Sequence, residues 1–470
     1  MKILLADPPA LEMSYDASYP NLGLLYLAGF VRKYIKTHKM EIEYVGPRHT
    51  LKSHLEFLKN FSPDIYGISF TSKTARLAYR TMEAVKTFAP SMLVVCGGAH
   101  PTAVPAEVMA GSSADVCVIG EGETSFLEIV KAVANNGRDF SKVAGIAFRI
   151  DDTVVFGEAR PFIVNIDDIP LPAWDLIDFN SYPGLHLKKM PTETSMLISR
   201  GCPYDCVFCS NPVWKSAKPW HRFRSAPNIC DEIRYLYSRG VREIYMTSDE
   251  INFNEEWAIE LCTSVAQLGY KDLIFQCNMR ADKVSDNLAR ALSKMNCWLV
   301  HLGIESVNDR VLKGIGKHVS ISEIREAVRI LSSAGIKIFA FMMLYQVWEE
   351  DGTLMFETHK EVDNSIRVMK ELFNKKQIHY MSWQFPTPLP GSRLFKIAKK
   401  HNLFSEDPDS TFERYGQHDI MMNIPGLTTK AMRRRLKKGI LLKDWFMIRS
   451  GAISISHMWR AWENIKSLIK

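Results

Sequence analysis

The sequence predicts an α/β protein in which a doubly wound, Rossmann-like parallel sheet precedes a partial (β/α)6 barrel and a helical C-terminal extension. Two observations predict this fold class. Short apolar runs alternate with helix-length segments over residues 1–150 and again from residue 193 onward, and this alternation is typical of parallel sheets. A proline-rich stretch within residues 151–192 separates the two patterns, so we expect a linker there. The chain of 470 residues has room for two or three domains.

The first pattern predicts strands at residues 2–6, 41–45, 65–70, 92–96 and 116–119, with helices at 22–34, 51–61, 76–88 and 126–134. Doubly wound sheets bind ligands outside the carboxyl ends of their strands. A Gly-x-Gly-x-x-Gly motif does not follow the first strand, so a dinucleotide is not expected. The strand ends carry small and polar residues that let a large ligand approach the backbone: Ser69, Thr71, Gly97, Gly98, His100, Gly120 and Glu121.

The second pattern predicts six strands, at residues 195–199, 243–247, 273–276, 299–304, 336–344 and 379–384. Together with the helices between them, they define a barrel domain over residues 193–400 and leave residues 401–470 as the extension. The catalytic groups of β/α barrels gather at the carboxyl ends of the strands. The candidates at these ends are Asp249, Glu250, Arg280 and Glu305.

Three cysteines lie within eight residues, directly after the first strand of the barrel, at Cys202, Cys206 and Cys209. A short loop with this spacing can direct three thiolates toward one metal centre. Thiolates suit zinc or iron-sulfur centres, but no fourth Cys or His follows at zinc-finger spacing. The run also differs from the four-cysteine ferredoxin motif. Three ligands on a four-iron cluster would leave one iron open for chemistry.

The Cys-x-x-x-Cys-x-x-Cys motif, with Phe208 before its last cysteine, resembles the signature of the radical S-adenosylmethionine (radical SAM) enzymes. The resemblance implies a 4Fe-4S cluster whose open iron chelates S-adenosylmethionine, and an external electron donor of the flavodoxin or ferredoxin type. An electron from the cluster then cleaves S-adenosylmethionine to a 5′-deoxyadenosyl radical. The resemblance also implies a contact from Asp249 or Glu250 to its amino group, with Arg280 and Glu305 beside it. Alternatively, these residues form ion pairs at the barrel mouth that have a purely structural role.

Residues 1–150 resemble the cobalamin-binding domain that precedes many radical SAM domains. The matching segments are Tyr19-Pro-Asn-Leu-Gly-Leu, the turn from Gly97 to Thr102, and Gly-Glu-Gly-Glu from Gly120. The resemblance implies that the nucleotide tail of cobalamin runs beside Ser69, Thr71, Gly97 and Gly98, with Gly120 and Glu121 near the cofactor. The stretch from Ala6 to Gly23 contains no histidine, so the lower cobalt ligand is not expected to be a protein imidazole. For His100 we expect a hydrogen bond to the cofactor edge or a turn contact.

The segment after the fifth barrel strand departs from the family pattern. Related enzymes usually continue into Gly-x-Pro-Gly-Glu, whereas this chain has Tyr345-Gln-Val-Trp348-Glu-Glu. Tyrosine and tryptophan present large flat apolar surfaces. We therefore expect Tyr345 and Trp348 to contact the substrate.

The charge distribution separates the body of the protein from its tail. Residues 430–470 carry eleven Lys or Arg and two acidic residues, a local +9, so the total of +7 leaves 7 − 9 = −2 for residues 1–429. Nucleic-acid binding is not indicated for the body. The tail predicts a basic amphipathic helix with tryptophans, which either packs over the barrel or lies on an anionic membrane. The N-terminus lacks a signal-peptide pattern, so a cytoplasmic protein, with peripheral membrane contact as an alternative, is expected.

These features together predict a cobalamin-dependent radical SAM methyltransferase that acts on an unactivated carbon of a small-molecule or lipid substrate. In the mechanism that the resemblance implies, one S-adenosylmethionine methylates cob(I)alamin and a second yields the radical that abstracts hydrogen. The substrate radical then takes the methyl group from methylcobalamin. The alternatives are a cyclase of the anaerobic magnesium-protoporphyrin ester type, another radical rearrangement or carbon-carbon coupling, and a cobalamin sensor.

Overall fold

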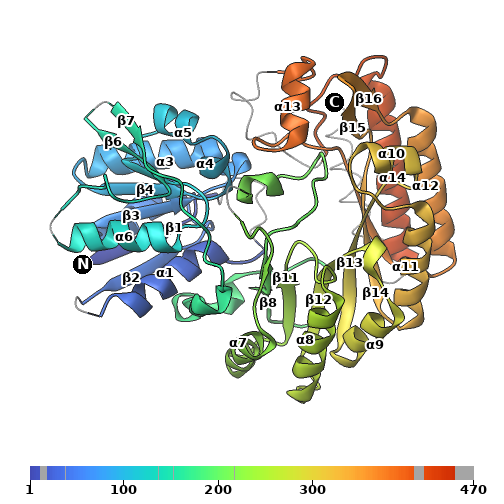
Figure 1. Ribbon diagram of the computed structural model, residues 1–470, viewed down its shortest axis with the longest axis horizontal. Helices are drawn as coiled ribbons and strands as arrows, with labels where there is room; N and C mark the ends of the chain where they lie inside the picture. Colours follow the sequence, from blue (N-terminus) through green and yellow to red (C-terminus); the bar gives the residue numbers. More distant parts are fainter. Residues whose placement is uncertain are drawn as a thin grey trace.

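The computed structural model describes residues 1–10, 18–36, 39–135, 137–151, 153–215, 218–406 and 418–449. Two α/β domains lie side by side, with the N-terminal domain on the left of Figure 1 and the barrel on the right. The predicted fold class is confirmed. The carboxyl ends of strands from both domains face the region between them, where the site is built.

The N-terminal sheet has the strand order β2-β1-β3-β4-β5-β6-β7. Its parallel part contains β1 (Lys2–Ala6), β2 (Glu41–Val45), β3 (Ile65–Ser69), β4 (Leu93–Gly97) and β5 (Val116–Val118). The strands β6 (Ile146–Ile150) and β7 (Thr153–Phe156) add an antiparallel edge that the sequence pattern did not predict. The domain boundary expected after residue 150 therefore falls inside a hairpin, and the first sheet ends at Phe156.

Helices cover both faces of this sheet because neighbouring strand residues point to opposite sides. Ile3 and Leu5 of β1 belong to the same core as the buried residues of α1 and α6, whereas Leu4 and Ala6 pack with α2, α3 and α5. Asn21 caps α1 by accepting a hydrogen bond from the amide of Leu24. The helices are α1 (Leu22–Tyr34), α2 (Leu51–Phe61), α3 (Ala75–Phe88), α4 (Ala99–Ala103), α5 (Pro105–Gly111) and α6 (Glu123–Ala134).

The linker contains little regular secondary structure, but it is well packed. It contains three 3-10 turns, Ile166–Asp168, Trp174–Leu176 and Phe179–Ser181. Trp174 is fully buried, and its indole Nε1 donates to Glu232 Oε1 of the barrel domain at 2.9 Å. Glu232 also accepts a hydrogen bond from Arg224, whose guanidinium lies 3.4 Å from the hydroxyl of Tyr26 on α1. A buried ion pair therefore joins the linker and both domains.

Glu232→Ala is expected to lower the free energy of unfolding by about 3–5 kcal/mol, because it leaves the Arg224 charge buried without its carboxylate. Asp231→Ala is the matched control, since it removes the adjacent carboxylate of the same helix. The Asp231 side chain is 69% exposed and its partner Arg234 is 52% exposed, so its loss should cost less than about 1 kcal/mol. Urea unfolding of the two variants makes the comparison. Equal losses would contradict a role for Glu232 at the domain junction.

The barrel sheet is entirely parallel and has the order β17-β14-β13-β12-β11-β8. Its strands are β8 (Glu193–Leu197), β11 (Glu243–Thr247), β12 (Ile274–Arg280), β13 (Cys297–Glu305), β14 (Lys337–Met343) and β17 (Tyr380–Gln384). The prediction of six strands is confirmed. Because β8 and β17 are the two edges and do not pair, the barrel is partial and open between them.

Helices pack outside the barrel (Figure 1), and two small two-stranded antiparallel sheets accompany it. The helices are α7 (Ala226–Ser238), α8 (Glu255–Gln267), α9 (Asp286–Lys294), α10 (Asp309–Gly314), α11 (Ile321–Ser333) and α12 (His359–Asn374). These sheets pair β9 (Ser199–Arg200) with β10 (Arg222–Phe223), and β15 (Val347–Glu350) with β16 (Thr353–Phe356).

The C-terminal helices α13 (Arg393–Lys400) and α14 (Thr429–Arg449) complete the described chain. α14 packs against the barrel: Phe446 stacks on Phe373 of α12 with ring centroids 3.4 Å apart, and Gly439 lies against the Trp383 ring of β17. No helix of the described residues is sufficiently long and apolar to cross a bilayer. Trp459 and Trp462, which the sequence placed on the tail, lie outside the described residues.

Candidate active site

A pocket of about 580 Å³ lies between the two domains. The N-terminal domain contributes the carboxyl ends of β3, β4 and β5 and the start of α1, and the barrel contributes the ends of β8, β11 and β12. The sequence analysis identified six of the lining residues, namely Ser69, Gly97, Gly98, Gly120, Glu121 and Asp249. The carboxyl ends of both sheets therefore face one shared space, as expected for each sheet separately.

Glycines make room on the N-terminal side of this pocket. A Cβ built on Gly120 would meet nothing within 4 Å, and the backbone there has φ +80°, which favours glycine. At Gly97 a Cβ would meet Val118 at 3.6 Å, an ordinary contact, so the absent side chain leaves open space rather than relieving a clash. Gly98 instead allows its own backbone to approach that of Phe70 closely. A Cβ built there would lie 2.8 Å from the Phe70 carbonyl oxygen, and the backbone has φ +107°.

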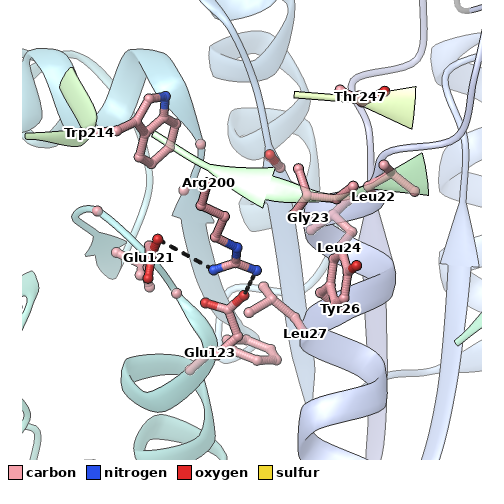
Figure 2. Close-up of a pocket in the computed structure, with 18 of the residues that line it drawn as sticks. Leu22, Gly23, Leu24, Tyr26, Leu27, Glu121, Glu123, Arg200, Trp214 and Thr247 are labelled. Atoms are coloured by element: carbon pink, nitrogen blue, oxygen red, sulfur yellow. Dashed lines mark hydrogen bonds and ion pairs between the residues drawn. The ribbon is translucent and has the colours of Figure 1, made fainter. Parts of the chain in front are cut away.

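Arg200 crosses the pocket from the barrel and binds two glutamates of the N-terminal domain (Figure 2). Its guanidinium donates to Glu123 and lies 3.5 Å from Glu121 Oε1, and Glu121 also accepts hydrogen bonds from Arg222. Burial alone would raise the pKa of Glu123, but Arg200 outweighs that effect and the pKa is lowered. Glu121 was expected beside the cofactor; it lines the pocket, yet its carboxylate is held by the two arginines.

The cysteine loop follows Arg200 directly, so this clamp fixes the start of the loop. Cys202 and Cys206 are about nine-tenths buried, and the Cys202 thiol lies 3.3 Å from Glu250 Oε2. The Cys206 thiol lies 3.8 Å from the Gly316 carbonyl oxygen, and Cys209 Sγ accepts from the Asn211 amide at 3.4 Å. Burial raises the pKa of the Cys202 thiol, assisted by the Glu250 charge, and raises that of Cys209 to about 11.

Charged barrel residues surround the loop. Lys317 Nζ lies 3.2 Å from Glu305 Oε1, and the Lys317 carbonyl oxygen accepts from Arg280 at 2.6 Å. Arg280 also pairs with Asp282 and lies over the Tyr204 ring at 3.6 Å. Burial raises the pKa of Glu250 to about 7. Because Asp249 borders the pocket and Glu250 contacts Cys202, two consecutive residues connect the pocket with the cysteine loop.

Several buried polar atoms in this region lack a hydrogen-bond partner among the described residues, and Glu305 Oε2 and Ser248 Oγ are two of them. An unpaired buried acceptor or hydroxyl costs about 1–3 kcal/mol, which a polar ligand would recover. In the described part of the chain, no three His, Cys, Asp or Glu side chains converge on a single ion. A cluster does not need that geometry, since each thiolate binds a different iron.

Comparison with known proteins identifies the family. The sequence matches the Radical SAM superfamily over residues 196–356 and the B12 binding domain over residues 13–130. It is 30% identical over 461 residues, 95% of each chain, to an uncharacterized methyltransferase of Pyrococcus horikoshii. The chain belongs to the B12-binding radical SAM enzymes. Enzymes of this family use a 4Fe-4S cluster, S-adenosylmethionine and cobalamin, so the three predicted cofactors are confirmed.

Both a methyltransferase and a cyclase are among the family members similar to this chain. The anaerobic magnesium-protoporphyrin IX monomethyl ester cyclase of Cereibacter sphaeroides is 28% identical over 386 residues, 81% of this chain and 60% of that enzyme. Among solved structures, the methyltransferase TsrM of Kitasatospora setae, with cobalamin and a 4Fe-4S cluster bound, has a TM-score of 0.73 at 14% identity and covers 93% of this chain and 90% of its own. It shows that the two-domain fold is shared.

The residues present fit the family's cofactors. Cys202, Cys206 and Cys209 would hold the cluster, and Glu250, Arg280 and Glu305 lie around that loop with one carboxylate oxygen unpaired. The glycine-lined side of the pocket would hold cobalamin. Its lining contains no histidine among the described residues.

Four predicted site residues, Thr71, His100, Tyr345 and Trp348, belong neither to the pocket lining nor to the group around the cysteine loop. Thr71 caps a 3-10 turn, and His100 makes the turn contact, with Nδ1 3.0 Å from Ser72 Oγ. Tyr345 and Trp348, for which a substrate contact was predicted, are both fully buried in this structure and do not line the pocket. Tyr345 bonds His359 through its hydroxyl at 2.8 Å, and the Trp348 ring packs against Gly314.

Proposed function

We propose that the protein transfers a methyl group to an unactivated carbon of a small-molecule substrate. One observation carries the proposal: the glycine-lined edge of the B12-binding sheet and the end of β11, with Ser248 and Asp249, border the same pocket. When bound, cobalamin would supply the methyl group, and S-adenosylmethionine with the cluster would supply the hydrogen-abstracting radical. A substrate in this space would meet both, as methyl transfer to such a carbon requires.

The chain's own residues hold this arrangement together. Arg200 joins the start of the cysteine loop to Glu123 at the beginning of α6, so cluster and cobalamin would keep a fixed separation. Arg280 and Glu305 offer a cation and a carboxylate to the two charged ends of an amino acid, and charge-assisted pairs of this kind are among the stronger hydrogen bonds. An electron donor of the flavodoxin or ferredoxin type would supply the reducing electrons.

The experiment supplies the reconstituted enzyme with a reductant, trideuteromethyl S-adenosylmethionine and a small-molecule extract of the source cells. Methyl transfer converts one S-adenosylmethionine to S-adenosylhomocysteine and a second to 5′-deoxyadenosine and methionine, while a C–H bond becomes C–CD3. We expect equal amounts of the two adenosyl products and one metabolite that gains the labelled methyl group. 5′-Deoxyadenosine without S-adenosylhomocysteine or label transfer would contradict methyl transfer and favour the cyclase-type alternative.

We also propose that the outer face of α14 touches an anionic membrane. Lys430, Arg433 and Arg434 are exposed there, and Trp445 is 45% exposed, while the inner face packs on the barrel.

Charge reversal tests this membrane contact more cleanly than truncation of α14, because truncation would uncover Trp383. Arg433→Glu with Arg434→Glu should weaken binding to phosphatidylserine vesicles at least about tenfold. Lys52→Glu with Lys59→Glu, on α2, is the control. Absence of vesicle binding by the wild-type protein would contradict the proposal.

A further inference from the structure

The inner face of the barrel is open along β14 and β17. On β14 the outward residues Ile338, Ala340 and Met342 are completely buried, whereas the inward Phe339 and Phe341 are only partly buried. The same alternation occurs on β17, where Trp383 is buried beneath α14 and its inward neighbours are partly exposed. Side chains along a strand alternate between faces, so the accessible positions are those that line the concave side of the partial barrel.

Aromatic side chains gather on this concave face. The His301 ring of β13 lies 5.3 Å from the ring of Phe339, 5.8 Å from that of Phe341 and 5.2 Å from that of Tyr245. His301 and Phe341 are nearly parallel, with an interplanar angle of 24°. We call these four residues, Tyr245, His301, Phe339 and Phe341, the aromatic wall. Flat rings of this kind favour a flat, unsaturated partner over a flexible saturated one.

A buried hydrogen-bond network fixes the tautomer of His301. Gln276 Nε2 donates to Glu193 Oε1 at 3.0 Å and to Glu243 Oε1 at 2.7 Å, so Gln276 Oε1 must face the histidine as an acceptor. His301 Nε2 lies 2.8 Å from that oxygen and therefore carries the proton. Burial lowers the pKa of His301 to about 4, so the ring is neutral at physiological pH.

The remaining nitrogen, His301 Nδ1, is consequently an acceptor. It has no hydrogen-bond partner among the described residues, and His301 is 6% exposed. A buried acceptor left unpaired costs about 1–3 kcal/mol. A ligand N–H or O–H group that reaches Nδ1 would recover this energy, whereas a ligand without a donor would not.

The aromatic wall is connected to the pocket. The Tyr245 hydroxyl donates to Asn278 Oδ1 at 2.7 Å, and Asn278 lines the pocket together with Asp249. We propose that the aromatic wall binds the substrate, and that the substrate is a planar, unsaturated molecule with an N–H or O–H group that donates to His301 Nδ1. This inference rests on the proposed function because it names the substrate class of that site.

The test uses 2-naphthol and 2-methoxynaphthalene as probes. Both present the same flat surface, but only the naphthol can donate a hydrogen bond. Calorimetric titration of the reconstituted holoenzyme should show 2-naphthol binding about fivefold to tenfold more tightly than its methyl ether, the effect expected of one net hydrogen bond. His301→Phe keeps an aromatic ring and removes the acceptor. In that variant we expect the preference to disappear while the methyl ether binds as before.

Phe341→Leu keeps the polar network intact and is the second variant, in case loss of the Gln276 partner impairs folding in His301→Phe. It should weaken both probes equally and preserve the naphthol preference. Equal wild-type affinities, binding of neither probe, or a preference that survives in His301→Phe would overturn the inference, as would binding of decanoate in place of naphthol. These titrations measure binding without turnover. A failed methyl-transfer assay would therefore contradict the proposed function without changing the result on the substrate class.

Discussion

Cys206→Ala is expected to abolish the 4Fe-4S cluster and with it all formation of 5′-deoxyadenosine. The loop supplies three thiolates, and a cluster that these three cysteines would hold loses one of its protein ligands in the variant. Cys206 is about nine-tenths buried, so an external thiol cannot easily replace it. Iron and sulfide analysis after anaerobic reconstitution, together with the electron paramagnetic resonance spectrum of the reduced protein, measures the cluster. Chromatography of the reaction products measures the nucleoside.

Cys230→Ala is the matched control for this prediction. Cys230 is equally buried, at 4% exposed, but lies on α7 away from the cysteine loop. It should retain the cluster and the activity. Full iron content in Cys206→Ala would show that another residue ligates the cluster. Loss of iron in both variants would mean that reconstitution responds to general destabilisation, and the assignment of Cys206 as a ligand would lose its support.

The alternation of strands and helices could be predicted because the spacing of apolar residues along the chain reflects which side chains are buried. The limits of β1, β2, β11, α1 and α2 agree with their predicted residue ranges. The β6–β7 hairpin was missed because it is short, lies at the edge of the sheet and pairs antiparallel, so its residues do not form the continuous apolar runs of buried parallel strands. The cysteine ligands were predictable for a different reason, because their spacing itself carries the chemistry.

Contacts between segments that are distant in the chain could not be predicted, because no pattern in the sequence indicates them. Arg200 and Glu123 are 77 residues apart in the chain and belong to different domains, and neither residue type nor spacing predicts their pairing. Lys317 was likewise missed, since it reaches Glu305 from the loop after α10. At Trp348 the residue type pointed to exposure, whereas the structure buries the side chain. Its aromatic character suggested a substrate surface, but the β15–β16 hairpin turns it inward against Gly314, where the absence of a side chain makes room for the ring.

Gly97→Leu is expected to weaken cobalamin binding while leaving the cluster intact. Gly97 lines the pocket at the end of β4, and its backbone does not require glycine. The carbons of leucine beyond Cβ would occupy space that the glycine leaves to the ligand. Overpacking of a fitted site costs about 1–3 kcal/mol, which corresponds to about fivefold to 150-fold weaker binding. Absorbance of bound cobalamin after gel filtration measures the loss, and iron analysis of the same sample measures the cluster.

Gly97→Ala is the control because its Cβ would meet Val118 at 3.6 Å, an ordinary contact that requires no movement. It should bind cobalamin nearly as well as the wild type. With leucine, label transfer should fall together with the amount of bound cobalamin, since that cofactor would carry the methyl group. Cleavage of S-adenosylmethionine should persist, because the cysteine loop and Glu250 are unchanged. If Gly97→Leu retains one cobalamin per chain, the cofactor does not lie against the end of β4. If it loses cobalamin and cluster together, the two sites depend on each other through the domain interface, and the Arg200 contact with Glu123 becomes the next position to vary.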